Sequence, residues 1–158
     1  MIVRVGDLQP EGLSIDRSIQ IGPLSMEGGL EIGVAEARLK ALLTPDSEGL
    51  LCAGRIQATA MVPCSRCLEP YALHVDREFD LSYQPGPSAA AAEPEVQIAA
   101  EDLDVAYLDP EGILDVGNLA AEQIYLEIPM KPLCSPDCKG LCPGCGANLN
   151  TEPCTCSR

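Results

Sequence analysis

A run of closely spaced cysteines is the feature that most restricts how this chain can fold. Six cysteines fall within the 23 residues from Cys134 to Cys156, and a further pair, Cys64 and Cys67, is separated by two residues far upstream. Two or three residues between thiols allow both sulfurs to reach one tetrahedral ion at about 2.3 Å, as in structural zinc sites. Eight cysteines make two complete four-thiolate sites, and Cys52 is left over. We therefore predict two zinc ions, bound by Cys64, Cys67, Cys134, Cys138, Cys142, Cys145, Cys154 and Cys156.

A disulfide scaffold is the competing interpretation of these cysteines. The opening residues MIVRVGDLQPEG have no basic segment followed by an apolar one, so we expect no secretory signal, and no apolar run approaches the roughly 18 residues that span a bilayer. We therefore expect a cytoplasmic protein without a membrane segment. In the reducing cytosol, clustered cysteines are typical of metal binding and not of disulfides. Zinc is favoured over an iron–sulfur cluster because ferredoxin-type cysteine runs are absent, and iron stays open as the alternative.

The eight cysteines can be divided between two sites in more than one way. We favour a local site made by the CPGC pair and the closing pair of cysteines, because adjacent glycines permit a tight approach of backbone to sulfur. The remaining site then clips the tail to the upstream pair. Site 1 is Cys64, Cys67, Cys134 and Cys138, and site 2 is Cys142, Cys145, Cys154 and Cys156. The alternative joins Cys134, Cys138, Cys142 and Cys145, and leaves Cys64, Cys67, Cys154 and Cys156 together.

The charge of the chain argues against a nucleic-acid-binding face. The net charge is −14, and the segment from Glu78 to Met130 holds 12 carboxylates and neither lysine nor arginine. Proteins that bind nucleic acid usually show a basic stripe, because neutralised phosphates supply much of the affinity. Filled four-thiolate zinc sites would add about −2 each. The acidic segment is compatible with a basic protein partner or with a solvated surface alone.

Alternation of apolar and polar residues predicts two long antiparallel strands on either side of the upstream cysteine pair. In Leu50–Val62 every second residue is apolar or small, and the same holds in Tyr71–Tyr83 apart from Arg77. A period of two over this length is typical of half-buried strands, so the upstream pair should lie at the tip of a hairpin. The segment Glu31–Leu43 fits an amphipathic helix locally, but it leads into this meander through the turn residues Thr44–Gly49. We therefore expect a strand there.

In that expected strand the alternating residues are Ala35, Ala37, Leu39, Ala41 and Leu43.

The remaining segments are read from their turn and capping residues. Residues 1–32 suggest an opening strand and loops, Gln84–Glu95 a surface loop rich in proline and alanine, and Val96–Leu114 one or two short extended pieces. Asp115 is a suitable N-cap for a helix of about three turns that Pro129 ends. The predicted fold is mainly β, of the α+β class: an antiparallel β-meander with one helix in the C-terminal half and a Cys-rich zinc-binding tail. We expect a sheet domain over residues 1–130 and a zinc module over 131–158, packed on the hairpin tip.

Nothing in the sequence supports an enzyme. A catalytic zinc keeps an open position and commonly uses histidine, whereas this chain has a single histidine, His74, on the polar face of a strand. Cys52 lies on an apolar face, where a buried structural thiol is expected. The acids Glu101, Asp102 and Asp104 offer only weak support for a hard cation. No phosphate-binding glycine loop and no nucleophile elbow is present.

The order of these features resembles the YceD family of large ribosomal RNA subunit accumulation proteins. The similarity runs from about residue 30 onward, and its most specific parts are CSRCLEP and PLCSPDCKGLCPGCGANLN. The resemblance implies a non-catalytic role in the accumulation or maturation of large-subunit (23S) ribosomal RNA. It also implies that the eight paired cysteines are metal ligands.

Two mechanisms are compatible with such a role. The acidic segment would hold a basic ribosomal protein or assembly factor of the large subunit, or the zinc module would contact precursor ribosomal RNA through Lys131, Lys139 and Arg66. Charge favours the first mechanism. A third interpretation, a zinc- or redox-responsive module, requires exposed and labile thiolates.

Overall fold

Within its described residues the chain folds into one long curved sheet, a small second sheet and one α-helix. The computed structural model describes residues 1–25, 31–47, 49–86 and 105–156. In chain order the elements are β1 (Ile2–Arg4), the short 3-10 helix η1 (Val5–Asp7), β2 (Leu13–Ile19), β3 (Leu24–Ser25), β4 (Glu31–Pro45), β5 (Leu50–Pro63), β6 (Pro70–Pro85), β7 (Val105–Leu108), β8 (Ile113–Asp115) and α1 (Val116–Leu126). Strands dominate and one helix follows them, which confirms the predicted fold class.

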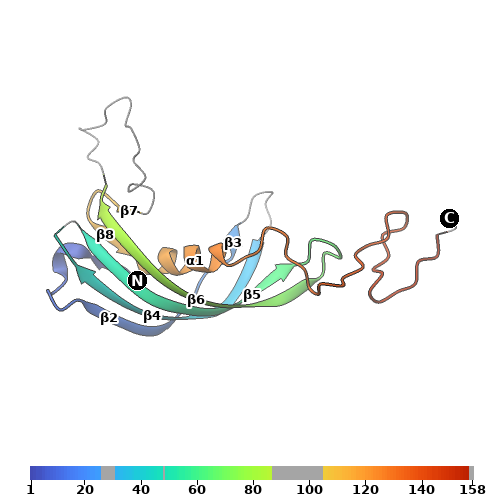
Figure 1. The fold of residues 1–158 in the computed structure, drawn as a ribbon, viewed down its shortest axis with the longest axis horizontal. Coiled ribbons are helices and arrows are strands. Elements are labelled where there is room, and N and C mark those ends of the chain that lie inside the picture. The colour runs from blue at the N-terminus through green and yellow to red at the C-terminus, as the bar shows by residue number, and fades with distance from the viewer. Residues whose placement is uncertain (26–30, 48, 87–104, 157–158) are drawn as a thin grey trace, which may run out of the picture.

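The large sheet has the strand order β2-β4-β5-β6-β7, with β3 paired to the start of β4. Neighbouring strands within this sheet are antiparallel except β6 and β7, which run parallel. The strands β1 and β8 pair in a separate antiparallel ribbon. The sheet is curved, and α1 lies in its hollow (Figure 1). The residues after α1 run toward the tip of the β5–β6 hairpin and continue beyond it (Figure 1). The cysteine-rich tail therefore lies at one end of the sheet.

The predicted alternation in β4, β5 and β6 produces the core. Ile56 and Ala60 of β5 are fully buried, whereas Gln57 and Met61 face solvent. The helix begins at its predicted cap, because Asp115 Oδ1 accepts a hydrogen bond from the Gly117 N–H at 2.8 Å. Its buried face packs against the hollow of the sheet and consists of Val116, Leu119, Ala120, Gln123 and Ile124.

Three details differ from the sequence prediction. Residues 13–19, expected as a loop, form β2 along the edge of β4, and Ile15 is the strand's only buried residue, so its sequence shows little alternation. Ala35 is exposed because the register shifts at a bulge between Val34 and Ala37, and Val34 is buried in its place. The strand β7 pairs parallel to β6, although an antiparallel meander was predicted.

Two predictions concern residues outside the described ranges. These are most of the loop expected at Gln84–Glu95 and the three acids Glu101, Asp102 and Asp104.

Candidate metal centres

The first group of thiols is organised by the tip of the β5–β6 hairpin. The strands pair without interruption as far as Pro63 opposite Pro70. Beyond that pair the Cys64 N–H donates to the Glu69 carbonyl and the Leu68 N–H to the Cys64 carbonyl, each at 2.9 Å. Leu68 adopts a positive φ of 63°, which turns the chain back sharply. This knuckle places Cys64 and Cys67 at the end of the β5–β6 hairpin.

The tail returns to this knuckle through backbone contacts. The Ser65 N–H donates to the Pro132 carbonyl at 2.8 Å, and the Leu141 N–H donates to the Arg66 carbonyl at 3.1 Å. The Arg66 guanidinium donates to the Cys138 carbonyl at 2.8 Å. These bonds hold the tail on both sides of the knuckle.

The contacts bring four sulfurs from two distant parts of the chain together. The Cys64 and Cys138 sulfurs lie 3.7 Å apart, as do those of Cys67 and Cys134. All four sulfurs lie within 4.8 Å of one another. We refer to Cys64, Cys67, Cys134 and Cys138 as the hairpin cluster.

The second group of thiols is built within the tail itself. Its members, here called the tail cluster, are Cys142, Cys145, Cys154 and Cys156, and their sulfurs also lie within 4.8 Å of one another. The Cys142 sulfur is 3.1 Å from that of Cys154 and 4.0 Å from that of Cys156. A side chain at Gly144 would place its Cβ 2.9 Å from the Cys156 sulfur, so glycine is required at this position for close packing.

Both clusters have the chemistry and spacing of a closed tetrahedral thiolate site. Sulfurs about 2.3 Å from one tetrahedral ion lie roughly 3.8 Å from each other. The sulfur–sulfur distances of 3.1 to 4.0 Å within these pairs are close to that value. Each cluster can therefore hold a metal ion with four protein ligands. The structure groups the sulfurs in the way that we favoured from sequence, and metal binding by them remains a prediction.

The thiols within each cluster differ in pKa. Backbone N–H groups lower the pKa of Cys64 to about 6, the donor of greatest effect being the Cys134 N–H. The pKa of Cys142 also falls to about 6, mainly through the Cys145 N–H. Desolvation of its sulfur raises the pKa of Cys134 to about 12. The protonated Cys156 thiol donates to the Cys145 sulfur and to its neighbours in the cluster, which raises the pKa of Cys156 to about 11. A metal ion would have to displace protons from the remaining thiols, so binding should weaken at low pH.

Two residues around the clusters were not predicted to support them. Arg66 was expected only as a cation available to RNA, yet its guanidinium donates a hydrogen bond to the Cys138 carbonyl. The side-chain amide of Asn150 donates to the Cys138 sulfur at 3.3 Å. The polar turn around Asn150 was visible in the sequence, but nothing there indicated a contact with the other cluster.

The two remaining candidate side chains are Cys52 and His74. Cys52 is fully buried in the core, and burial raises the pKa of its thiol to about 12. This confirms the predicted buried thiol and argues against a nucleophile. His74 is exposed on the face of the sheet away from α1, where its ring contacts the Thr59 hydroxyl at 3.2 Å.

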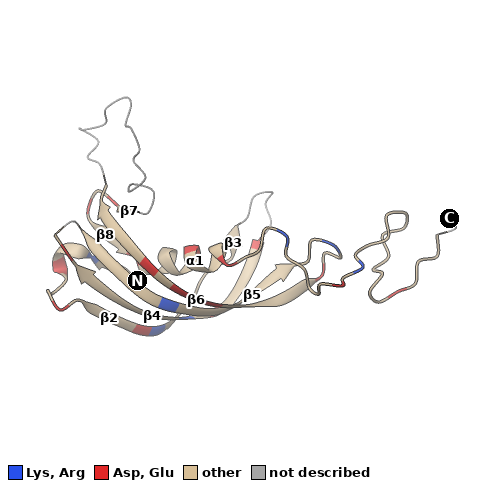
Figure 2. Ribbon diagram, viewed as in Figure 1, with Lys and Arg blue, Asp and Glu red and all other residues tan. Residues whose placement is uncertain are grey.

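The acids of this segment that the structure describes do not share one face. Glu78 and Asp80 lie on the outer face of β6, whereas Glu122 in α1 and Glu127 at its C-cap lie on the other side of the sheet (Figure 2). Charge on the outer face is partly neutralised by ion pairs within the face itself. Its ion pairs are Arg38 and Lys40 with Asp16, and Arg55 with Asp76 and Glu78.

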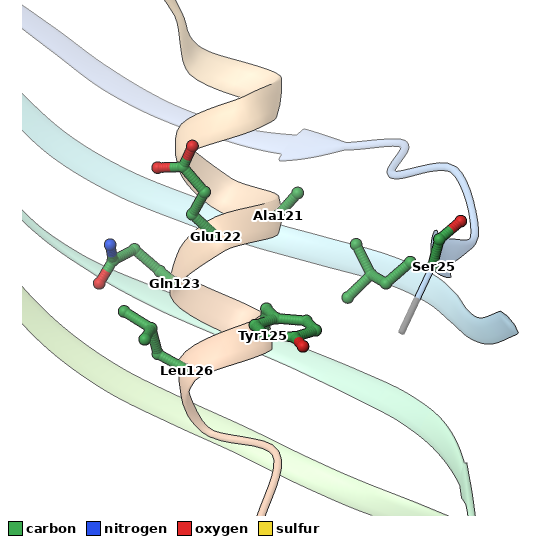
Figure 3. Close-up of a pocket in the computed structure, with 7 residues that line it drawn as sticks. Ser25, Ala121, Glu122, Gln123, Tyr125 and Leu126 are labelled. Atoms are coloured by element: carbon green, nitrogen blue, oxygen red, sulfur yellow. The ribbon is translucent and has the colours of Figure 1, made fainter. Parts of the chain in front are cut away.

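A hollow of about 430 Å³ lies beside α1, away from both clusters. Figure 3 shows Ala121 and Tyr125 on the side of the helix that faces Ser25. Leu126, also at the hollow, is 61% exposed, and Glu122 is an exposed carboxylate beside it. The hollow is therefore an apolar surface with an acidic neighbour and is open to solvent.

No helix among the described residues is long and apolar enough to cross a membrane.

Comparison with known proteins identifies relatives over much of this chain. The family described as "Large ribosomal RNA subunit accumulation protein YceD" matches residues 52–158, which include both clusters. An uncharacterized protein of Mycobacterium tuberculosis is 35% identical over 107 residues, 68% of this chain and 48% of that protein. One of Mycobacterium leprae is 30% identical over 129 residues, 79% of this chain and 56% of that protein.

A plant protein carries the family name over a shorter stretch. The chloroplastic large ribosomal RNA subunit accumulation protein YCED homolog 1 of Zea mays is 50% identical over 44 residues, 27% of this chain and 15% of the maize protein. The chain spans about half the length of the mycobacterial relatives it matches. No solved structure matches it.

Proposed function

This chain belongs to the YceD family of large ribosomal RNA subunit accumulation proteins, and we propose that it assists accumulation of large-subunit ribosomal RNA without catalysing a reaction. In this proposal the sheet and α1 hold a basic ribosomal protein or assembly factor of the large subunit. The two cysteine clusters bind zinc and stabilise the tail. The proposed action is therefore that of a binding protein that supports ribosome assembly in the cytoplasm.

The proposed metal sites have a structural role. Four thiolates leave a zinc ion no open position for water or substrate, so zinc would supply folding energy and not catalysis. The hairpin cluster would clip a zinc module, residues 131–158, to the tip of the sheet domain. The tail cluster would hold that module in shape. Iron is the alternative metal, and elemental analysis of protein purified without added metal distinguishes the two.

Stoichiometry and proteolysis together test the two sites. We expect two zinc ions per chain, and one in each of the variants Cys64→Ser and Cys154→Ser. The variant Cys52→Ser is the matched control and should retain both. In Cys64→Ser we expect proteases to cut near Cys134 while the region around Cys154 stays protected. Two retained ions in Cys64→Ser would contradict the assignment of that thiol.

The proposal of a basic partner rests on the surface around the hollow beside α1. Tyr125 and Leu126 are exposed there, at 40% and 61%, next to the Glu122 carboxylate, which has no ion-pair partner among the described residues. By contrast, Arg38, Lys40 and Arg55 on the outer face of the sheet are already paired with carboxylates. An apolar surface with unpaired negative charge is complementary to a basic segment that carries an apolar anchor.

Site-specific photo-cross-linking tests this partner. A cross-linking amino acid at Leu126 would be compared with one at Leu51, which is 41% exposed on the opposite face. We expect cross-links from position 126 to a basic large-subunit ribosomal protein or assembly factor, resistant to RNase and lost at high salt. Cross-links of equal yield from both positions, or none to a basic protein, would contradict the proposal.

Direct RNA contact is the second candidate, favoured by two exposed lysines beside the clusters. Lys131 precedes Cys134 and Lys139 follows Cys138, and both side chains are exposed. When the protein is recovered from a cell lysate, co-purification of precursor ribosomal RNA that is abolished by Lys131→Ala with Lys139→Ala, but not by changes at Leu126, would support this candidate.

A further inference from the structure

Asn150 makes a hydrogen bond that connects the two cysteine clusters. It lies in the loop between Cys145 and Cys154 of the tail cluster. Its side-chain Nδ2 donates to the sulfur of Cys138 in the hairpin cluster at 3.3 Å. Its Oδ1 accepts from the Lys139 N–H at 2.8 Å. One side chain from the tail-cluster loop thus holds both the sulfur and the following peptide of a hairpin-cluster ligand.

This contact differs from the other hydrogen bonds to the sulfurs. The Cys64 and Cys154 sulfurs accept from backbone N–H groups two residues further along the chain. In the part of the chain that the structure describes, Asn150 is the only side chain other than cysteine that donates to a cysteine sulfur. A donor to a thiolate stabilises its negative charge and fixes its direction, and losing such an outer partner typically costs 10–100-fold in metal affinity.

The position of Asn150 depends on the loop that the tail cluster closes. Asn148 caps this loop, because its Oδ1 accepts from the backbone and side-chain N–H groups of Asn150 at 3.1 and 2.9 Å. The Leu149 N–H donates to the Gly140 carbonyl at 2.9 Å, and the Cys142 N–H donates to the Ala147 carbonyl at 2.8 Å. The Thr151 and Glu152 N–H groups also donate to the Asn148 carbonyl, at 3.1 and 2.8 Å, so these bonds set the loop as far as Glu152. Beyond it the ligands Cys154 and Cys156 are exposed. A metal ion bound by those two thiols would hold this end of the loop in place.

We propose that Asn150 is a positioning residue that couples the two clusters, so that metal bound in the tail cluster tightens metal binding in the hairpin cluster. The inference rests on the proposed metal sites. Filling the tail cluster orders the 145–154 loop and holds the Asn150 amide against the Cys138 sulfur. Because binding linkage is reciprocal, filling the hairpin cluster tightens the tail cluster by the same factor.

A double-mutant cycle on the full chain tests this coupling. The probe is cadmium, measured by chelator competition with native mass spectrometry, and cadmium-113 NMR assigns each ion to its cluster. The first change is Asn150→Ala. The second is the pair Cys154→Ser and Cys156→Ser, which empties the tail cluster. Thr151→Ala is the matched control in the same loop, since its hydroxyl contacts the Asn148 carbonyl and no sulfur.

With the tail cluster filled, we expect Asn150→Ala to weaken cadmium binding in the hairpin cluster about 10–100-fold. Emptying the tail cluster should weaken it by a similar factor, and Asn150→Ala should then add little. Asn150→Asp, which keeps the acceptor but replaces the donor with a charge beside the thiolate, should weaken binding further. Thr151→Ala should leave the affinity and the hairpin-cluster resonance unchanged.

Two results would overturn the inference. The first is an effect of Asn150→Ala that has the same size whether the tail cluster is filled or empty, because the two clusters would then be independent. The second is no change in affinity or in the hairpin-cluster resonance. A wild-type chain that binds fewer than two ions would instead refute the proposed metal sites, so failure of the coupling and failure of the sites are distinguished. Far-UV circular dichroism checks that each variant retains the sheet.

Discussion

Arg66 and Cys138 are 72 residues apart in the chain, yet the Arg66 guanidinium donates to the Cys138 carbonyl at 2.8 Å. The carbonyl of the same arginine accepts from the Leu141 N–H at 3.1 Å. Arg66 therefore connects the hairpin tip to the tail through both its side chain and its backbone. Only the side-chain contact can be removed by substitution, which makes its contribution measurable.

We expect Arg66→Ala to loosen the tail without removing a thiol. A hydrogen bond from a charged donor contributes about 1.5–3 kcal/mol, and we expect the lower end of that range because this bond is only partly buried. Proteolysis between Pro132 and Cys138 should become faster, and a chelator should extract the hairpin-cluster metal more readily. Arg38→Ala, at an exposed arginine distant from the tail, is the control. Unchanged cleavage and extraction in Arg66→Ala would show that the backbone contacts alone hold the tail.

The two clusters should lose metal at different rates. Three of the four hairpin-cluster cysteines are buried, whereas Cys145, Cys154 and Cys156 of the tail cluster are exposed. Solvent access allows chelators and oxidants to reach the tail cluster first. With mild chelator or peroxide, alkylation and mass spectrometry should find the tail-cluster thiols labelled before those of the hairpin cluster. Resistance of both clusters to peroxide would argue against a redox-responsive module.

The contact between Arg77 and α1 should contribute more to stability than the surface pairs. Arg77, the exception in the alternating pattern of β6, lies on the core side and donates to the Gln123 side-chain oxygen at 3.1 Å and to Glu127. Gln123 is only 3% exposed, so Arg77→Ala leaves a buried oxygen unsatisfied. We expect a loss of about 1–3 kcal/mol in the free energy of unfolding. The loss in Arg55→Ala, which removes an exposed pair, should be about 0–1 kcal/mol. Urea unfolding at constant free zinc measures both, and equal losses would contradict this assignment.

The buried Cys52 thiol should make stability fall at high pH. Burial and the nearby Asp80 charge raise its pKa to about 12, from an ordinary value of 9.0. Between these values the unfolded chain loses the proton while the folded chain keeps it, so ionisation stabilises the unfolded state. The contribution of this thiol is complete below pH 9 and is lost as the pH rises toward 12.

The variant Cys52→Val isolates this effect. Its free energy of unfolding should decline less steeply between pH 9 and 10.5 than that of the wild-type chain. Parallel curves would show that Cys52 does not titrate as described. In the folded protein at pH 8, the thiol should also resist iodoacetamide until unfolding.

Much of the fold is predictable from sequence because its central strands obey a strict period of two. The alternation in β5 and β6 identifies both the core face and the hairpin tip, and Asp115 marks the start of α1 through its capping side chain. The strand β2 was missed because it lies at an edge and buries only Ile15. The bulge that exposes Ala35 depends on how two strands fit together, which one strand's pattern does not reveal.

The grouping of the sulfurs follows from local spacing, but the residues that support them do not. Cys142 and Cys145 carry the spacing of a knuckle in their own sequence. Arg66 and Asn150 act on Cys138 from other segments of the chain, so their roles depend on the folded path of the tail. The acidic segment likewise reads as one unit in the sequence, but its acids within the described ranges are divided between two sides of the sheet.

The chain order of the hairpin cluster has a consequence for synthesis. Cys67 and Cys134 are 67 residues apart, so a growing chain displays half of the site long before it can complete it. A zinc ion held there would close a loop of that length, which removes about 4 kcal/mol of conformational freedom from the unfolded chain. Nascent chains that have emerged only as far as β7 should therefore carry no tightly bound ion at the hairpin tip. Zinc retention would then mark chains whose translation has passed Cys138.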